Sequence, residues 1–248
     1  IIRRQWEKTH AVRHKGSIDL VTETDVAVEA FLKERLGELL PQAEFLAEES
    51  CVAGQEPSPL CWIIDPVDGT TNFVHRIPQV GTSVALWADG HVVLGVVNVP
   101  MMDECFWAGL GMGAFRNGEP IHVSTAGTLS DAVVATGFPY AIADVWTMCW
   151  PSGLVLPKAQ GVRRLGPPRW IWPMWPPDGR MPLRDAAQAL GCGCRLAAGG
   201  RSRRTRHDAG WPPVFLRDEI MASNGLVHKE LRHLLAGVTP VQAERRPA

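Results

Sequence analysis

The 248-residue sequence lacks a long apolar run and has almost no net charge. No run reaches the roughly 18 residues that a membrane span needs, and no signal peptide is visible. With 25 Lys and Arg against 26 Asp and Glu, the formal net charge is −1. Nothing in this balance indicates nucleic acid or an anionic membrane. We therefore expect neither as a partner.

A disulfide framework is also lacking. The six cysteines show no framework spacing, and reduced thiols in the cytosol are the better interpretation for a chain this long. Cys192 and Cys194 have no second pair beside them, and a zinc site needs four ligands at a wider spacing. The cysteines therefore predict no metal site of their own.

The sequence changes character near residue 140. Before it, patterns predict a helix over 25–40 and strands over 61–64, 82–87, 92–97, 104–108 and 113–115. Asp89-Gly90 and Asn117-Gly118 predict tight turns. From about 145 to 213, six tryptophans and crowded prolines fit neither period. We expect an N-terminal α+β sub-domain over 1–140, truncated at its start because the chain opens without methionine. A C-terminal α/β sub-domain is expected over 141–248, with its pattern disrupted.

Two carboxylates follow the predicted strand at 61–64. Asp65 and Asp68 stand three residues apart in a turn set by Pro66 and Gly69. They can converge on hard cations with the Val67 carbonyl between them, and Mg²⁺ prefers such oxygen ligands. Two ions about 4 Å apart would polarise a phosphoryl group and activate a water. Alone, this turn is weak support, because Asp, Pro and Gly are common turn formers.

The longer string around the turn is more specific. Residues 62–73 read WIIDPVDGTTNF, which resembles the signature of the inositol monophosphatase family. Further segments agree in order and spacing, namely 19–25, 45–50, 95–97, 113–118 and 222–225. The resemblance, over about 15–165 and 215–235, implies a layered α-β-α-β-α sandwich of the inositol monophosphatase and fructose bisphosphatase type. It also implies two or three Mg²⁺ ions and a homodimer in the cytoplasm.

The resemblance implies roles for individual residues. Glu48, Asp65 and the Val67 carbonyl would bind the first metal, and Asp65 with Asp68 the second. Thr70 with Asp25 would orient the attacking water, with Glu48 a further catalytic residue; such positioning suits phosphoryl transfer. The expected phosphate contacts are Asp68, Gly69, Thr70 and Thr71. As alternatives, Asp25 simply caps the helix that follows and Glu49 is solvated.

The second half departs from the family pattern. The family supplies one more aspartate there, in a Lys-Pro-Trp-Asp-like segment, and no such segment occurs here. Codons for residues 187–194, read one base later, can encode Leu-Lys-Pro-Trp-Asp-Val-Ala, and 145–153 and 169–177 likewise give helix-like strings in a shifted frame. We hypothesise frameshifts in this half. Sequencing the DNA tests this, since codons that do not permit the second reading contradict it.

The expected function is magnesium-dependent hydrolysis of a phosphate monoester, with inositol monophosphate ranked first. Histidinol phosphate, a sugar bisphosphate and a nucleotide 3′-phosphate are alternative substrates. An inactive remnant that keeps only the first-half metal turn is the rival from another class. A nucleic-acid module built on the basic run 201–206 is a distant third, because no aromatic platform accompanies it.

Overall fold

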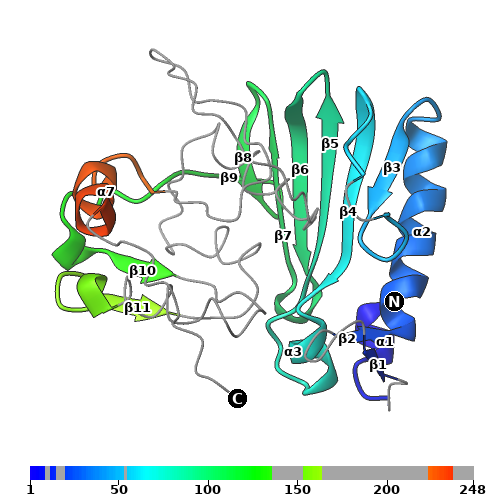
Figure 1. Cartoon of the computed structure of the whole chain (residues 1–248), viewed down its shortest axis with the longest axis horizontal. Coiled ribbons are helices and arrows are strands. Elements are labelled where there is room, and N and C mark those ends of the chain that lie inside the picture. Colours follow the sequence, from blue (N-terminus) through cyan, green and yellow to red (C-terminus); the bar gives the residue numbers. More distant parts are fainter. Residues whose placement is uncertain (9–11, 15–19, 53–54, 136–152, 164–222, 237–248) are drawn as a thin grey trace, which may run out of the picture.

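A computed structural model describes residues 1–8, 12–14, 20–52, 55–135, 153–163 and 223–236 of the chain. Its centre is a seven-stranded sheet in the order β3-β4-β5-β6-β7-β8-β9 (Figure 1). The strands are Glu44–Ala47, Leu60–Asp68, Gly81–Ala88, His91–Val99, Glu104–Gly109, Gly113–Arg116 and Glu119–Ile121. Only the β3–β4 pair within this sheet is parallel. This mixed sheet with its helices confirms the predicted α/β class.

Tight turns join the antiparallel strands where the sequence predicts them. Asp89 and Gly90 have φ of 46° and 86°, and Asn117 and Gly118 have 51° and 88°. Two consecutive positive φ angles are the geometry that hairpins favour, because it matches the twist of the flanking strands. The turn residues therefore fix the register of β5 with β6 and of β8 with β9.

The helix α2, Glu23–Leu39, begins two residues before its predicted start. The Thr22 hydroxyl accepts from the Thr24 N–H at 3.2 Å, and Asp25 accepts from the Thr22 N–H in return. This capping box satisfies N–H groups that a helix start leaves unpaired. Of the apolar positions at helical spacing, Val28 is buried, whereas Phe31 and Leu39 are 47% and 74% exposed. The buried face of α2 is therefore narrower than the apolar pattern of the sequence indicates.

The strand β4 contributes to two buried clusters and runs further than predicted. Trp62 and Ile64 pack in one buried cluster with side chains of α2, while Cys61 and Ile63 belong to another. Alternate residues of a strand point to opposite faces, so β4 is buried on both sides. The predicted end of this strand at residue 64 is wrong, because a bulge accommodates Pro66, which has no N–H to donate, and β4 continues to Asp68.

The remaining elements lie at the two ends of the described structure. Near the N-terminal start of α2 lie α1 (Ile2–Gln5), β1 (Val12–His14), β2 (Leu20–Thr22) and α3 (Thr70–Val74) (Figure 1). Apart from the sheet lie β10 (Val133–Ala135), β11 (Gly161–Arg163) and α7 (His228–Ala236). Short 3₁₀ helices occupy Pro100–Met102 and Leu129–Asp131. In the part of the chain that the structure describes, no helix is long and apolar enough to cross a membrane.

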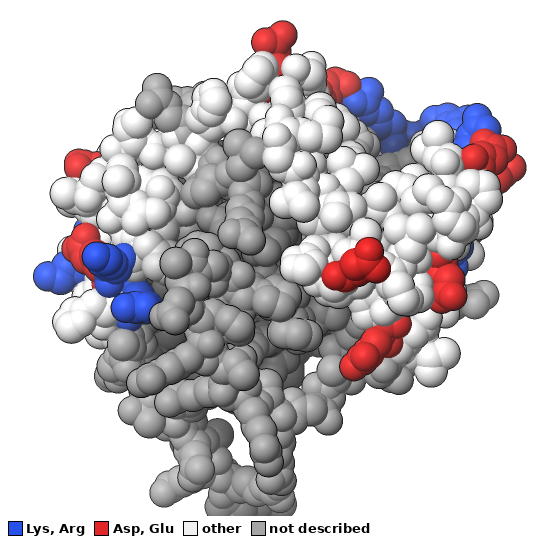
Figure 2. All heavy atoms as spheres, turned by 90° about the horizontal axis from the view of Figure 1, so that it is seen from above, with Lys and Arg blue, Asp and Glu red and all other residues white. Residues whose placement is uncertain are grey.

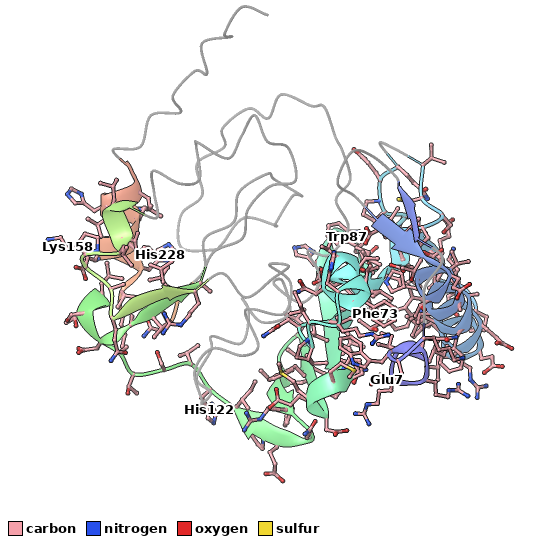
Figure 3. The ribbon with its side chains drawn as sticks, turned by 90° about the horizontal axis from the view of Figure 1, so that it is seen from below. Glu7, Phe73, Trp87, His122, Lys158 and His228 are labelled. Atoms are coloured by element: carbon pink, nitrogen blue, oxygen red, sulfur yellow. The ribbon has the colours of Figure 1, made fainter. Side chains whose placement is uncertain are left out.

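A small second core joins segments that are distant in sequence. Its buried residues are Leu129, Val155, Val227 and Leu231. The Asn224 amide donates to the carbonyls of Ser124 at 3.1 Å and Ala126 at 2.8 Å. Figure 3 shows Lys158 and His228 in this separate group. Most of the stretch 145–213, including the segments 169–177 and 187–194, lies outside the described residues, so the sub-domain boundary stays a prediction.

Candidate active site

A β-bulge shapes the end of β4 that carries the two aspartates. Asp65 pairs with Ser83 and Asp68 with Gly81, so three steps along β4 match two steps along β5. In a regular strand, residues three apart point to opposite faces. The extra residue of the bulge brings Asp65 and Asp68 to the same side. The Thr82 hydroxyl, which donates to the Pro66 carbonyl at 2.9 Å, holds the bulge in place.

The chain turns directly from this bulge into α3. Gly69 precedes the helix with φ 99° and ψ 39°, a left-handed conformation that suits glycine. Phe73 is fully buried with Val28, Val67 and Val80, and Figure 3 shows it in the crowded region between α3 and the N-terminal elements. The first N–H groups of a helix have no partner within it. The predicted phosphate contacts therefore form one continuous strand-to-helix junction.

The Thr70 hydroxyl links this junction to α2. It lies 2.9 Å from Asp25 Oδ1 and 3.1 Å from the Val67 carbonyl, and it has one hydrogen to donate to these two acceptors. Asp25 and Thr70 are 45 residues apart in sequence. The structure thus brings together the pair that the family resemblance implies for orienting water.

Asp25 has two structural tasks. Burial raises the pKa of its carboxyl, and hydrogen bonds from Thr22 and Thr70 offset part of that rise. Its Oδ2 accepts from the Thr22 N–H at 2.9 Å and from the Thr22 hydroxyl at 2.5 Å, while Oδ1 is left to face Thr70. Asp25 therefore completes the helix cap and also contacts Thr70, and its role in orienting water stays a prediction.

Asp68 is 6% exposed, and its carboxylate is repelled by the negative charge of Glu48. Burial raises the pKa of Asp68 well above its usual value, and the charge of Glu48 raises it further. Among the described residues, nothing donates a hydrogen bond to its buried Oδ2 atom. A buried carboxylate oxygen of this kind is costly unless a donor or a cation satisfies it.

Glu48 reaches the site from the end of β3. Its N–H donates to the Ile64 carbonyl at 3.1 Å, which extends the parallel pairing of β3 with β4 by one residue. Glu48, Asp65, Asp68 and the Val67 carbonyl offer only oxygen atoms, a donor set that suits Mg²⁺. In the described part of the chain, however, no three His, Cys, Asp or Glu side chains group closely enough to hold a metal ion. The ligand set therefore stays a prediction.

Several supporting residues were missed from the sequence. Thr22-x-x-Asp25 fits the capping-box pattern and could have been found by it. Glu29 and Lys33 stand four apart, as helical ion pairs do, but nothing in their spacing reveals that Glu29 is buried. The hydrogen bond from Thr82 to Pro66 depends on the bulge, which has no sequence signal here.

Charged side chains of the described residues do not gather in one large patch on the face that Figure 2 shows. Figure 2 shows acidic and basic side chains spread in small groups of both signs over the face seen from above. The basic run 201–206 lies outside the described residues. The described part of that face thus gives no support to a nucleic-acid module.

Comparisons with known proteins bear on the family and the fold of this chain. The profile of the inositol monophosphatase family matches residues 1–147, more than half of the 248 residues. Inositol monophosphatase 3 of Solanum lycopersicum is 45% identical over 142 residues, covering 55% of this chain and 52% of that protein. Nus factor SuhB of Escherichia coli K12 is 39% identical over 142 residues, covering 56% and 53%.

A solved structure extends the likeness in fold. The IMPase of Thermotoga maritima superposes with a TM-score of 0.69 at 27% identity, covering 96% of this chain and 91% of that one. The chain spans about half the length of the curated relatives that it matches in sequence. The family profile nevertheless matches residues 1–147, which are more than half of the chain, and the chain therefore belongs to the inositol monophosphatase family.

Proposed function

We propose that this chain hydrolyses a phosphate monoester with Mg²⁺, with an inositol monophosphate ranked first among substrates. The observation that carries the proposal is the β4 bulge, which turns Asp65 and Asp68 to one side just before Gly69 and Thr70. Metal ligands and phosphate contacts would thereby adjoin each other within a few residues. Histidinol phosphate, a sugar bisphosphate and a nucleotide 3′-phosphate remain alternative substrates.

Mg²⁺ would be held by Glu48, Asp65, Asp68 and the Val67 carbonyl. The buried Oδ2 of Asp68 supports this, because a cation there would offset both its burial and the charge of Glu48. The proposal requires the three carboxylates to converge when the cation binds. Bound Mg²⁺ supplies charge neutralisation for the phosphoryl group and activation of water. Two or three ions per site remain the prediction.

The residues of the chain would orient the attacking water. With its hydrogen directed to Asp25 Oδ1, the Thr70 hydroxyl keeps lone pairs that accept a hydrogen bond from water. As the water transfers a proton to Thr70 Oγ1, the Thr70 hydroxyl would pass its own proton to Asp25 Oδ1, so that the carboxylate takes up the proton. Gly69, Thr70 and Thr71 would hold the phosphate through the N–H groups and hydroxyls of the strand-to-helix junction.

An inactive family member is the second candidate. The absence of a Lys-Pro-Trp-Asp-like segment from the sequence favours it, because that segment supplies a further metal ligand in the family. Such a chain would keep the fold of the first half and bind metal weakly. A homodimer and a cytoplasmic location stay predictions for both candidates.

Phosphate release from inositol 1-phosphate separates the two candidates. The purified 248-residue chain is assayed with Mg²⁺ and with EDTA, beside Asp68→Asn. We expect metal-dependent release that Asp68→Asn abolishes, because the variant loses a negative ligand. Asp103→Asn, which changes an exposed carboxylate paired with Arg3, serves as the matched control and should leave the rate unchanged. No release by the unaltered chain, with release restored after correction of the reading frame, would favour the inactive form.

A further inference from the structure

Three charged residues form a stripe along α2 that faces the candidate site. Asp25, Glu29 and Lys33 are spaced four residues apart, which places them one above another on the same face of a helix. Asp25 accepts from Thr70, Glu29 Oε2 accepts from the Glu49 N–H at 2.8 Å, and Lys33 donates to Ser50 Oγ. The stripe therefore contacts the segment after β3 and the junction after β4 from a single rigid element.

Glu29 is an unusual member of this stripe because its carboxylate is buried. The residue is 5% exposed, and its Oε1 accepts from Lys33 Nζ at 2.9 Å. A buried carboxylate is tolerated when a cation and hydrogen bonds compensate it, and hydrogen bonds to a charged acceptor are stronger than neutral ones. Glu29 therefore makes a strong tether between α2 and the backbone of Glu49, 20 residues away.

The tether acts on the residue that follows Glu48. The N–H of Glu48 is held by the Ile64 carbonyl of β4, and the N–H of Glu49 is held by Glu29 of α2. Two consecutive N–H groups fixed by different elements set the orientation of the backbone around Glu48. The direction in which the Glu48 side chain leaves the chain then depends on Glu29.

We propose that Glu29 is a positioning residue for the divalent cation site, which it serves by fixing Glu48 without contacting the cation. The inference rests on the proposed function. Because α2 carries Asp25 as well, one helix would set both Glu48 and the Thr70 hydroxyl. Outer residues that orient metal ligands typically contribute about 10–100-fold in metal affinity.

Three substitutions separate the tether from the charge. Glu29→Gln removes the charge but keeps an oxygen that accepts from the Glu49 N–H. Glu29→Met removes the acceptor at similar size, and Glu29→Asp keeps the charge but shortens the reach. Glu38→Met, which removes an exposed carboxylate of the same helix paired with Arg35, is the matched control.

Binding of Mn²⁺ to the full chain, followed by electron paramagnetic resonance of the free ion, is the first measurement. We expect Glu29→Met and Glu29→Asp to raise the dissociation constant about 10–100-fold. Glu29→Gln should restore it to within a few-fold of the unaltered chain, and Glu38→Met should leave it unchanged. If Glu29 served only the stability of the fold, the Mn²⁺ affinity would not differ between Glu29→Gln and Glu29→Met, provided that circular dichroism shows both variants to be folded.

Hydrogen exchange of the Glu49 amide in the metal-free chain is the second measurement. It should accelerate in Glu29→Met and Glu29→Asp but not in Glu29→Gln. If Glu29→Met does not fold, Glu29→Asp decides.

Two different failures can be told apart. Folded Glu29→Asp that binds Mn²⁺ as tightly as the unaltered chain, while Glu48→Gln binds weakly, overturns the positioning role alone. If the unaltered chain binds no Mn²⁺ although exchange at Glu49 responds to Glu29, the proposed function fails and the positioning role fails with it.

Discussion

The seven-stranded sheet and the small core of β10, β11 and α7 are assembled in different ways. The sheet is built mainly from neighbouring strands joined by tight turns, such as Asp89-Gly90 between β5 and β6. The small core joins Leu129, Val155 and Leu231, which lie far apart in sequence. All the candidate site residues lie on β4 of this sheet, directly after β3 or β4, or on α2 and α3 beside the sheet. The difference teaches that local patterns predict the turns and most strands of the sheet, whereas a core built from distant segments leaves no such pattern in the sequence.

The largest expected effect is on kcat in Asp25→Asn, a variant that tests the chemistry of the site separately from its folding. Asp25→Asn keeps the size of the side chain, but its amide can face Thr70 and donate to the hydroxyl that previously donated to Asp25. Thr70 then loses its carboxylate partner. We expect kcat for phosphate release to fall about 10²–10⁴-fold, the usual contribution of a general base. Steady-state kinetics measure this.

The stability of the variant provides its control. Chemical unfolding of Asp25→Asn should show a folded chain with a cooperative transition. A variant that is folded and fully active would contradict the role of the Thr70–Asp25 pair.

A pair of core truncations tests whether the two regions are independent. Ile64→Ala empties a fully buried position in β4, and Leu231→Ala empties a position that is 7% exposed in α7. Each should lower the free energy of unfolding by about 2–5 kcal/mol, with Ile64→Ala the larger loss because its surroundings are more enclosed. Urea unfolding measures both.

Hydrogen exchange in β4 then sharpens the comparison. It should rise in Ile64→Ala and stay unchanged in Leu231→Ala, since no residue of the small core belongs to the clusters around β4. Equal loss of protection in both variants would mean that the two regions unfold as one unit.

The smallest expected effect is a pH dependence of stability. Because the pKa values of Asp25 and Asp68 are both raised on folding, both carboxyls bind protons more tightly in the folded chain than in the unfolded chain above pH 3.8. The free energy of unfolding of the chain in EDTA should therefore fall as the pH rises from 3.8 through the raised pKa values. Asp25→Asn should reduce this slope, and an unchanged slope in the variant would show that Asp25 does not contribute.

The sequence predicted those features that short-range patterns determine. The turns at Asp89-Gly90 and Asn117-Gly118 are confirmed because few residues adopt consecutive positive φ angles. The helix over 25–40 was found within two residues at each end, and its capping box explains the earlier start. The family string at 62–73 covers the junction between two elements of the structure. Asp65 and Asp68 lie in β4, and Thr70 begins α3 directly after it.

Other features depend on contacts between distant segments, which no local pattern records. The bulge in β4 arises from its register with β5, so the strand was predicted to end four residues too early. The burial of Glu29 depends on the segment after β3, and the short strand β3 was not predicted because its four residues lack a clear alternation. The contact of Thr70 with Asp25 came only from the family resemblance.

The most direct test of the account is a crystal of this chain soaked with Mn²⁺ and measured for anomalous scattering. The account predicts a peak bounded by Glu48, Asp65, Asp68 and the Val67 carbonyl, next to Gly69 and Thr70, and its loss in Asp68→Asn. A peak elsewhere in the unaltered chain, or no peak at a saturating concentration, would contradict the claim that the first half of the chain holds the metal.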